Sequence, residues 1–248
     1  DGGTMVRPES EQIVRDNMNG ILSELARQDA DIYLLQEVDF DSYRSYYVNQ
    51  ADTYRHGLSL NMAVAYNYKC DFVPFPWPPL GKVESGLVTF TDLNVTQATR
   101  ESLPVPFTWP MRVANLKRCL LVERVPVEGT EKELVIINLH LEAYDDGEGK
   151  AAQTAALLEV LEEEYAAGNY VIAGGDFNQT FPGTLDAWPM LDDTYWTPGV
   201  LSEDILPEGW SFAYDVDVPS CRLDNAPYDP ETSQHYVIDG FIVSPNVE

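Results

Sequence analysis

Three short apolar segments of this sequence each lead directly into polar residues. They cover residues 31–38, 133–139 and 170–176. Runs of this length, rich in Val, Ile, Leu and Tyr, are typical of strands buried inside a sheet. Because α/β proteins place their functional side chains at the ends of such strands, the three segments predict a sheet with a site along one edge.

Amphipathic helices accompany these strands. Apolar residues recur every three or four positions over residues 10–27, which predicts a helix leading into the strand at 31–38. A second helix is expected over about residues 150–166, ended by Gly168. Its predicted buried face consists of Ala151, Ala155, Leu158, Leu161 and Tyr165. A helix that feeds a buried strand is half of a βαβ unit, so we expect an α/β fold.

The remaining sequence supplies shorter strands and long connections. Strands are expected at residues 62–68, 86–90, 119–125 and 236–243. Prolines make the connection at 72–80 non-helical, and residues 179–235 form an irregular stretch in which any short elements are unresolved. A length of 248 residues with 44% hydrophobic content fits one large domain, which we expect to cover residues 1–248.

The charge balance is strongly acidic. Fifteen basic residues against 41 acidic ones give a net charge of −26. Such a field repels polyanions, so it disfavours nucleic acid as a partner, although a local basic patch would override it. The commoner meaning of an acidic surface is solubility. Nothing in the sequence indicates a protein partner.

Cysteine use and hydropathy indicate neither a metal cluster nor a membrane span. Cys70, Cys119 and Cys221 have no CxxC spacing and cannot all pair, so we interpret them as packing residues. No apolar run is long enough to cross a bilayer, and the sequence does not open like a secretory signal. Since a leader can be removed from a precursor, the compartment stays open.

The polar residues at the three strand ends form one chemical set. Carboxylates, an imidazole and amides are the groups that hold a hard cation and handle a phosphate beside it. The set consists of Gln36, Glu37, Asn138, His140, Asp176 and Asn178.

Together these motifs resemble the endonuclease/exonuclease/phosphatase superfamily. The resemblance lies in Gln-Glu after one strand, Asn-x-His-Leu after another and Gly-Asp-Phe-Asn after a third, and it covers about residues 13–243. The superfamily includes deoxyribonuclease I, abasic-site nucleases, inositol phosphatases and bacterial sphingomyelinases. The resemblance implies a two-sheet α/β sandwich flanked by helices, and a phosphoester hydrolase that uses Mg²⁺ or Mn²⁺.

The resemblance also implies a role for each matching residue. Glu37 would bind the metal ion. Asp176 would orient or deprotonate the attacking water, and Asn178 would hold this water or a phosphate oxygen. His140 would donate a hydrogen bond to a phosphate oxygen. Asp239 would orient a catalytic histidine in a Ser-Asp-His motif further along the chain.

Each of these residues also has a purely structural interpretation. Glu37 would then be a strand-end glutamate paired with a lysine or arginine. Asp176 and Asn178 would close an Asx turn, which these residue types often do. His140 would be an ordinary buried histidine.

Two features depart from the family pattern at the ends of the sequence. No Ser-Asp-His motif occurs before Glu248, and the asparagine of the family's first strand would lie before Asp1. We therefore expect the sandwich to lack its first and last strands and the natural protein to extend both ways. We also expect a gap beside the 31–38 strand, or a neighbouring element that fills it, and an Asp239 carboxylate that faces the site without its histidine.

Basic residues gather just before the strand that leads to His140. Four occur within thirteen positions, and Arg118, which heads its strand, is our candidate for gripping a substrate phosphate, because a guanidinium can clamp two phosphate oxygens. A surface salt bridge to one of the many acids is an equally weighted alternative.

The expected substrate is a small or lipid phosphoester. The aromatic, proline-rich segment at 72–80 suits an apolar part of a substrate or a membrane surface, or it simply packs as a long loop. Two other functions stay open. One is a nuclease with the same chemistry, acting on DNA or RNA, and the other is a non-catalytic relative that binds a ligand or partner through the same pocket.

Overall fold

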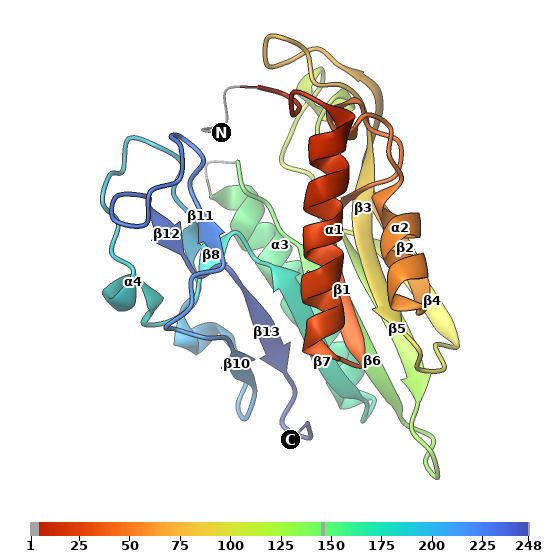
Figure 1. The fold of residues 1–248 in the computed structure, drawn as a ribbon. Coiled ribbons are helices and arrows are strands. Elements are labelled where there is room, and N and C mark those ends of the chain that lie inside the picture. Colours follow the sequence, from red (N-terminus) through yellow and green to blue (C-terminus); the bar gives the residue numbers. More distant parts are fainter. Residues whose placement is uncertain (1–4, 145–146, 248) are drawn as a thin grey trace.

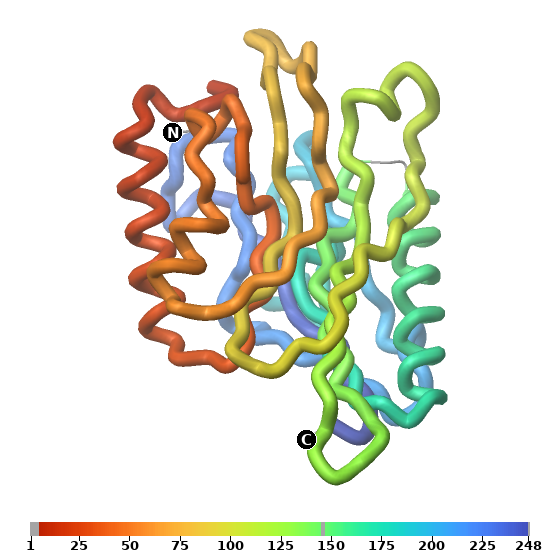
Figure 2. The backbone as a smooth tube through the Cα atoms, turned by 90° about the vertical axis from the view of Figure 1, so that its right-hand side faces the viewer, coloured from red at the N-terminus to blue at the C-terminus, as the bar shows by residue number. Residues whose placement is uncertain are grey.

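Two β-sheets pack face to face between outer helices. The structure is a computed structural model that describes residues 5–144 and 147–247. Viewed along the layers, two helices lie outside one sheet and a long helix lies outside the other (Figure 2). This four-layer arrangement confirms the predicted two-sheet α/β sandwich.

The first sheet has three antiparallel strands, with β3 (Gly81–Thr91) between β1 (Ile32–Asp39) and β2 (Asn61–Val73). Its outer face carries α1 (Glu11–Gln28) and α2 (Gln50–Leu58), which follows a short 3-10 turn, η1 (Tyr43–Ser45) (Figure 1). The helices bury Val14, Met18 and Ala51 against this sheet, which contributes Val38 and Phe90 to the same apolar cluster.

The second sheet has six strands in the order β10-β13-β7-β6-β5-β4. They are β4 (Gln97–Ser102), β5 (Cys119–Pro126), β6 (Glu133–His140), β7 (Tyr170–Asp176), β10 (Ser211–Ala213) and β13 (Asp239–Val243). β6 and β7 are parallel and are joined by α3 (Glu148–Ala166), whereas the other pairs are antiparallel. A parallel pair needs such a crossover, which covers one face of the sheet.

The irregular stretch after β7 contains only short elements. They are β8 (Gln179–Thr180), α4 (Thr184–Ala187), β9 (Gly199–Val200), η3 (Glu203–Ile205), β11 (Cys221–Arg222) and β12 (His235–Tyr236), and a further 3-10 turn, η2 (Met111–Val113), precedes β5. No helix in the described ranges is long and apolar enough to cross a membrane.

A buried asparagine fixes the two sheets against each other. Asn138 on β6 is fully buried, and its Nδ2 donates to the carbonyl oxygens of Leu35 (3.3 Å) and Val88 (3.2 Å) in the facing sheet. Its Oδ1 accepts a hydrogen bond of 2.9 Å from Gln36 Nε2. Because a buried amide must find partners, these bonds set the position of the β1 end relative to the β6 end.

Several predicted elements need correction. The strands expected at 62–68 and 86–90 are parts of one long hairpin, β2 and β3. The proline-rich segment expected to be non-helical contains the connection between them. The strand expected at 236–243 is split, because β12 pairs with β11 whereas β13 pairs with β7. The buried face of α3 includes Gln153, Leu157 and Leu161, but Ala151 and Ala155 are exposed.

One edge of the first sheet is open where a gap was expected. Within residues 5–144 and 147–247, β1 pairs with β3 alone. That the domain spans residues 1–248 and that the natural protein continues beyond both ends stay predictions.

Candidate functional site

Three polar side chains lie in a row across three neighbouring strands. His140 at the end of β6 is the register partner of Asp176 at the end of β7, and Asp176 is in turn the register partner of Asp239 at the start of β13. Register partners point to the same face of a sheet, so the sheet itself gathers this imidazole and two carboxyl groups at one rim.

The backbone at the end of β7 explains why the Gly-Asp-Phe-Asn motif begins with glycine. Gly175 has a φ of +141°, and a Cβ there would lie 2.1 Å from the carbonyl oxygen of Leu139. Only glycine accepts this approach. Next, Oδ1 of Asp176 accepts a 2.8 Å hydrogen bond from the backbone N–H of Asn178, whose φ is +50°. The Asx turn considered above therefore exists, and it holds the Asp176 carboxyl group at the rim.

His140 is buried and uncharged. Only 4% of the residue is exposed, and its Nε2 lies 3.3 Å from Oδ2 of Asp176. Burial, with the positive charge of Arg118 next in importance, lowers the pKa of His140 to about 3. Its Nδ1 has no hydrogen-bond partner among the described residues. The ring therefore holds one proton at neutral pH, which it can donate to an anion.

Both aspartates at the rim have a raised pKa, and Asp239 contributes to the rise at Asp176. Burial and then the neighbouring Asp239 raise the pKa of Asp176, while the backbone hydrogen bond from Asn178 opposes the rise. Burial likewise raises the pKa of Asp239, and a hydrogen bond with Ser220 opposes it. Two carboxyl groups this close resist ionising together, so the pair can hold a proton close to neutral pH.

Arg118 is a buried cation with unused donors. Its side chain is 2% exposed, and Nε and Nη1 have no hydrogen-bond partner in the described structure. The carboxylate of Glu142 lies 4.0 Å from Nε, beyond hydrogen-bond distance. The pairing of Arg118 with an acid, considered as its structural interpretation, is thus present, but it is a long, buried ion pair and not a surface one. Since buried donors are rarely left unpaired, this guanidinium indicates a site for an anion.

Glu37 leaves β1 at an irregularity in the strand. The pairing of β1 with β3 shifts register between Leu35 and Val38, and Glu37 adopts a φ of +52°. Its side chain is 52% exposed, and Oε2 lies 3.2 Å from Nη1 of Arg44. The pairing with an arginine, considered as the structural interpretation of Glu37, is thus present. Burial of the carboxyl group opposes ionisation, but the charges of Arg44 and Arg118 outweigh it and lower the pKa of Glu37.

These side chains share two adjoining cavities. One, of about 400 Å³, is lined by Glu37, His140, Asp176 and Asp239. The other, of about 220 Å³, is also lined by Glu37, His140 and Asp176, and it adds Arg118 and Asn178. All six residues expected at the site therefore meet there, although the amide Nδ2 of Asn178 is already bonded to the carbonyl oxygen of Leu141.

The structure adds residues that the sequence did not single out. Arg44 binds Asp39 through Nε and Nη2 and reaches Glu37 with Nη1. Arg222, Tyr144 and Trp196 line the smaller cavity. Arg222 had one available signal, since it is the single basic residue between positions 179 and 235.

The residues at the rim suit a magnesium-type ion held by few protein ligands. No group of three or more His, Cys, Asp and Glu side chains in the described part of the chain could coordinate one metal ion. Mg²⁺ commonly binds through one or two carboxylates and completes its shell with water and substrate phosphate oxygens. Glu37, an ionised carboxylate with half of its side chain exposed in the cleft, fits that role.

Comparison with known proteins agrees with this fold. A family model described as the endonuclease/exonuclease/phosphatase family matches residues 17–226. A protein so described from Beutenbergia cavernae superposes with a TM-score of 0.63 at 17% identity, covering 92% of this chain and 58% of that one. For truncated TDP2 from Caenorhabditis elegans the TM-score is 0.58 at 17% identity, covering 94% and 78%.

A phosphatase has the same fold. For a mannosyl-6-phosphatase from Bacteroides thetaiotaomicron the TM-score is 0.58 at 17% identity, with 94% of this chain and 78% of that one covered. None of the curated protein sequences matches. At these identities the solved structures show a common fold, and the chain spans little more than half of the Beutenbergia protein.

Proposed function

Since this chain belongs to the endonuclease/exonuclease/phosphatase family, we propose that it is a divalent-metal-dependent hydrolase whose substrate is a small or lipid phosphoester. The observation that carries the proposal is the buried Arg118 guanidinium in the cavity that His140 and Asp176 also line. Its Nε and Nη1 have no hydrogen-bond partner among the described residues. A phosphate oxygen in that cavity would satisfy these donors.

Each side chain at the rim has a different role in the proposed hydrolysis. Arg118 holds the phosphate, and the neutral His140 donates its proton in a hydrogen bond to a phosphate oxygen. Asp176, when ionised, orients a water molecule and accepts its proton as the water attacks phosphorus. The bond from phosphorus to the leaving oxygen breaks, and this oxygen takes up a proton from solvent water. The raised pKa of Asp176 suits a base, because proton transfer is efficient when the pKa of the base lies close to the working pH.

Glu37 would hold the metal ion. When bound, the ion would stabilise the negative charge that develops on the phosphoryl oxygens. Arg44 would release Glu37 to the ion and keep its bonds to Asp39. Because a partly exposed ion pair is worth at most about 1 kcal/mol, this exchange costs little. Asp239 lines the same cavity and supports the protonation of Asp176.

Charge and cavity size support a small substrate. A net charge of −26 repels polynucleotides, whereas cavities of about 220 and 400 Å³ suit one phosphoester group and a modest substituent.

An exposed aromatic tip supports an apolar or lipid substrate. In the β2–β3 hairpin, Phe72 is 59% exposed and Trp77 is 88% exposed, so these rings do not pack into the core. The hairpin extends past the end of β1 that carries Glu37, because Asp39 pairs with Ser85 and β3 begins at Gly81. The aromatic tip therefore lies at the same end of the sandwich as the site, where it could contact a lipid surface.

The substrate class can be tested by comparing three substrates with the full-length protein and Mg²⁺. They are a nitrophenyl phosphodiester, sphingomyelin in vesicles and supercoiled plasmid. We expect a higher kcat/KM on one of the first two than on plasmid. If plasmid is the best substrate, the protein is a nuclease, and if no phosphoester is cleaved although inorganic phosphate binds, it is a non-catalytic relative.

A further inference from the structure

A second cavity lies at the opposite end of the sandwich from the catalytic rim. This distal pocket, of about 440 Å³, is bounded by the start of β2, the end of β3, the loop at 92–96, β4 and Glu123 of β5. Glu123 of β5 follows Arg118, which directly precedes this strand, by five positions, and this corresponds to about 16 Å of extended chain. The distal pocket is therefore separate from the site described above.

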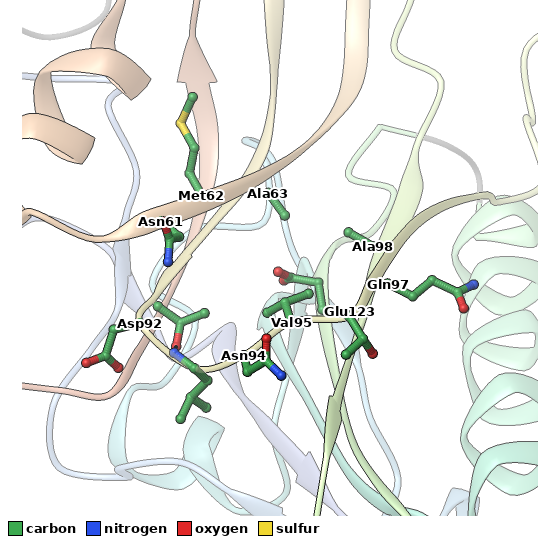
Figure 3. A pocket seen from close by; sticks show the side chains of 12 residues that line it. Asn61, Met62, Ala63, Asp92, Asn94, Val95, Gln97, Ala98 and Glu123 are labelled. Atoms are coloured by element: carbon green, nitrogen blue, oxygen red, sulfur yellow. Dashed lines mark hydrogen bonds between the residues drawn. The ribbon is translucent and has the colours of Figure 1, made fainter.

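A buried carboxyl group with one unpartnered oxygen forms its inner wall. Glu123 is 1% exposed, and its Oε2 has no hydrogen-bond partner in the described structure. Figure 3 shows the Glu123 side chain extending from β5 into the space between the strand that carries Ala63 and the loop that carries Val95. Thr89 bonds the carboxyl group, but it leaves Oε2 unpaired. Because a buried oxygen that lacks a partner is costly, Oε2 points to a missing positive or donating group.

The rest of the wall favours an organic cation over a metal ion. Asp92 and Glu123 line the pocket, and none of its lining residues is Lys, Arg or His. Ala63, Val95 and Ala98 add apolar surface. A hydrated metal ion gains nothing from an apolar wall, whereas an alkylammonium uses one carboxylate for its charge and an apolar wall for its carbon chain. The acidic field of the whole protein also concentrates cations near the surface.

We propose that the distal pocket binds a small organic cation through a primary ammonium group that donates to Glu123. The amide side chains of Asn61 and Asn94, which also line the pocket, offer oxygens for the remaining ammonium protons. The alkyl part of the ligand lies against Ala63, Val95 and Ala98.

The test is calorimetric titration of the full-length protein with n-butylammonium chloride, in a buffer without amines. We expect saturable one-to-one binding, at least about tenfold tighter than that of n-butanol, which has the same chain without the charge. Glu123→Gln should weaken the binding at least about tenfold, whereas Glu131→Gln, which removes an exposed acid from a turn, should leave it unchanged.

A second variant separates loss of the site from loss of the fold. Ala98→Trp keeps Glu123 but fills part of the pocket, so it should also abolish binding while the protein unfolds at an unchanged temperature. The proposal is overturned if wild-type protein shows no saturable binding, or if both variants bind as tightly as wild type. Saturable Ca²⁺ binding that requires Glu123, without any butylammonium binding, would also overturn it.

Discussion

At the scale of single residues, the two carboxyl oxygens of Asp176 differ, because one closes a turn and the other faces His140. Its Oδ1 closes the turn that begins after β7, and its Oδ2 lies 3.3 Å from His140. The turn therefore fixes the orientation of the carboxyl group before any substrate arrives, which is the preorganisation that a general base requires.

Substitution of Asp176 or of His140 should slow the proposed hydrolysis strongly. We expect Asp176→Asn and His140→Ala each to lower kcat by at least about a hundredfold, as is usual for groups that act in the transition state. Asp193→Asn, in the exposed loop at 192–195, is the matched control and should retain activity. Steady-state kinetics on a nitrophenyl phosphodiester checks this, and near-normal turnover of Asp176→Asn would remove Asp176 from the mechanism.

The buried Glu123 should make stability depend on pH. Burial raises the pKa of Glu123 in the folded protein, and a hydrogen bond from Thr89 opposes only part of the rise. A carboxyl group whose pKa is higher when folded stabilises the fold at pH values below its unfolded pKa of about 4.3, and this contribution is lost as the pH rises through the folded pKa.

Glu123→Gln should therefore gain stability over wild type as the pH increases. We expect the difference between their urea unfolding midpoints to grow from pH 4.5 to pH 8 in buffers without amines. Glu131→Gln should follow wild type throughout. A difference that is constant over this range would mean that Glu123 does not titrate differently in the folded and unfolded protein.

At the scale of elements, the contact of Asn138 with the facing sheet is the feature that joins the two halves of the site. Asn138→Ala would remove three donor contacts, to Leu35, Val88 and Thr89, and would remove one of the two acceptors of Gln36 Nε2. We expect a loss of about 1–3 kcal/mol in the free energy of unfolding, measured by urea denaturation. Asn19→Ala, on the exposed face of α1, should change this free energy by less than about 1 kcal/mol.

The aromatic hairpin should govern binding to lipid surfaces. Trp77→Ser should reduce the bound fraction in sedimentation with phosphatidylcholine vesicles at least about threefold, because it removes an exposed aromatic side chain from the hairpin tip. Its kcat on a water-soluble phosphodiester should not change. Equal vesicle binding by wild type and variant would show that the hairpin tip does not contact lipid.

Elements with strong periodicity were predictable, whereas weakly patterned ones were not. The helix at 10–27 and the strand at 170–176 were located to within about one residue. α2 was missed because it is short and its start depends on a cap, in which Asn49 accepts from the N–H of Asp52. β4 was missed because it is a polar edge strand that pairs with β5 alone.

The face of α3 was mispredicted for a related reason. Alanine has little apolar surface, so Ala151 and Ala155 do not determine which side of the helix packs against the sheet. Leu157 and Leu161 are fully buried, and Gln153 is buried beside them because its Nε2 donates to the carbonyl oxygen of Pro104.

At the scale of the whole molecule, the pairing of the strands brings the residues of separate sequence motifs together in one site. The motifs indicated which residue types would meet, but the register that places His140, Asp176 and Asp239 side by side follows from strand pairing, which no local pattern fixes. The burial of Arg118, and the lack of hydrogen-bond partners for its Nε and Nη1 among residues 5–144 and 147–247, likewise depend on the fold. An acidic body around a buried cation is the arrangement that attracts metal ions and still admits one phosphate.

The central claim is that this acidic sandwich uses a metal ion at Glu37 to cleave phosphoesters. It is tested most directly by the rate of nitrophenyl phosphodiester hydrolysis by the full-length protein as Mg²⁺ is titrated after treatment with a chelator. We predict no activity without metal, saturable activation by Mg²⁺, and for Glu37→Gln a loss of at least about tenfold in apparent Mg²⁺ affinity that Glu131→Gln does not share. Hydrolysis that persists in chelator, or Mg²⁺ activation that is identical in wild type and Glu37→Gln, would contradict the claim.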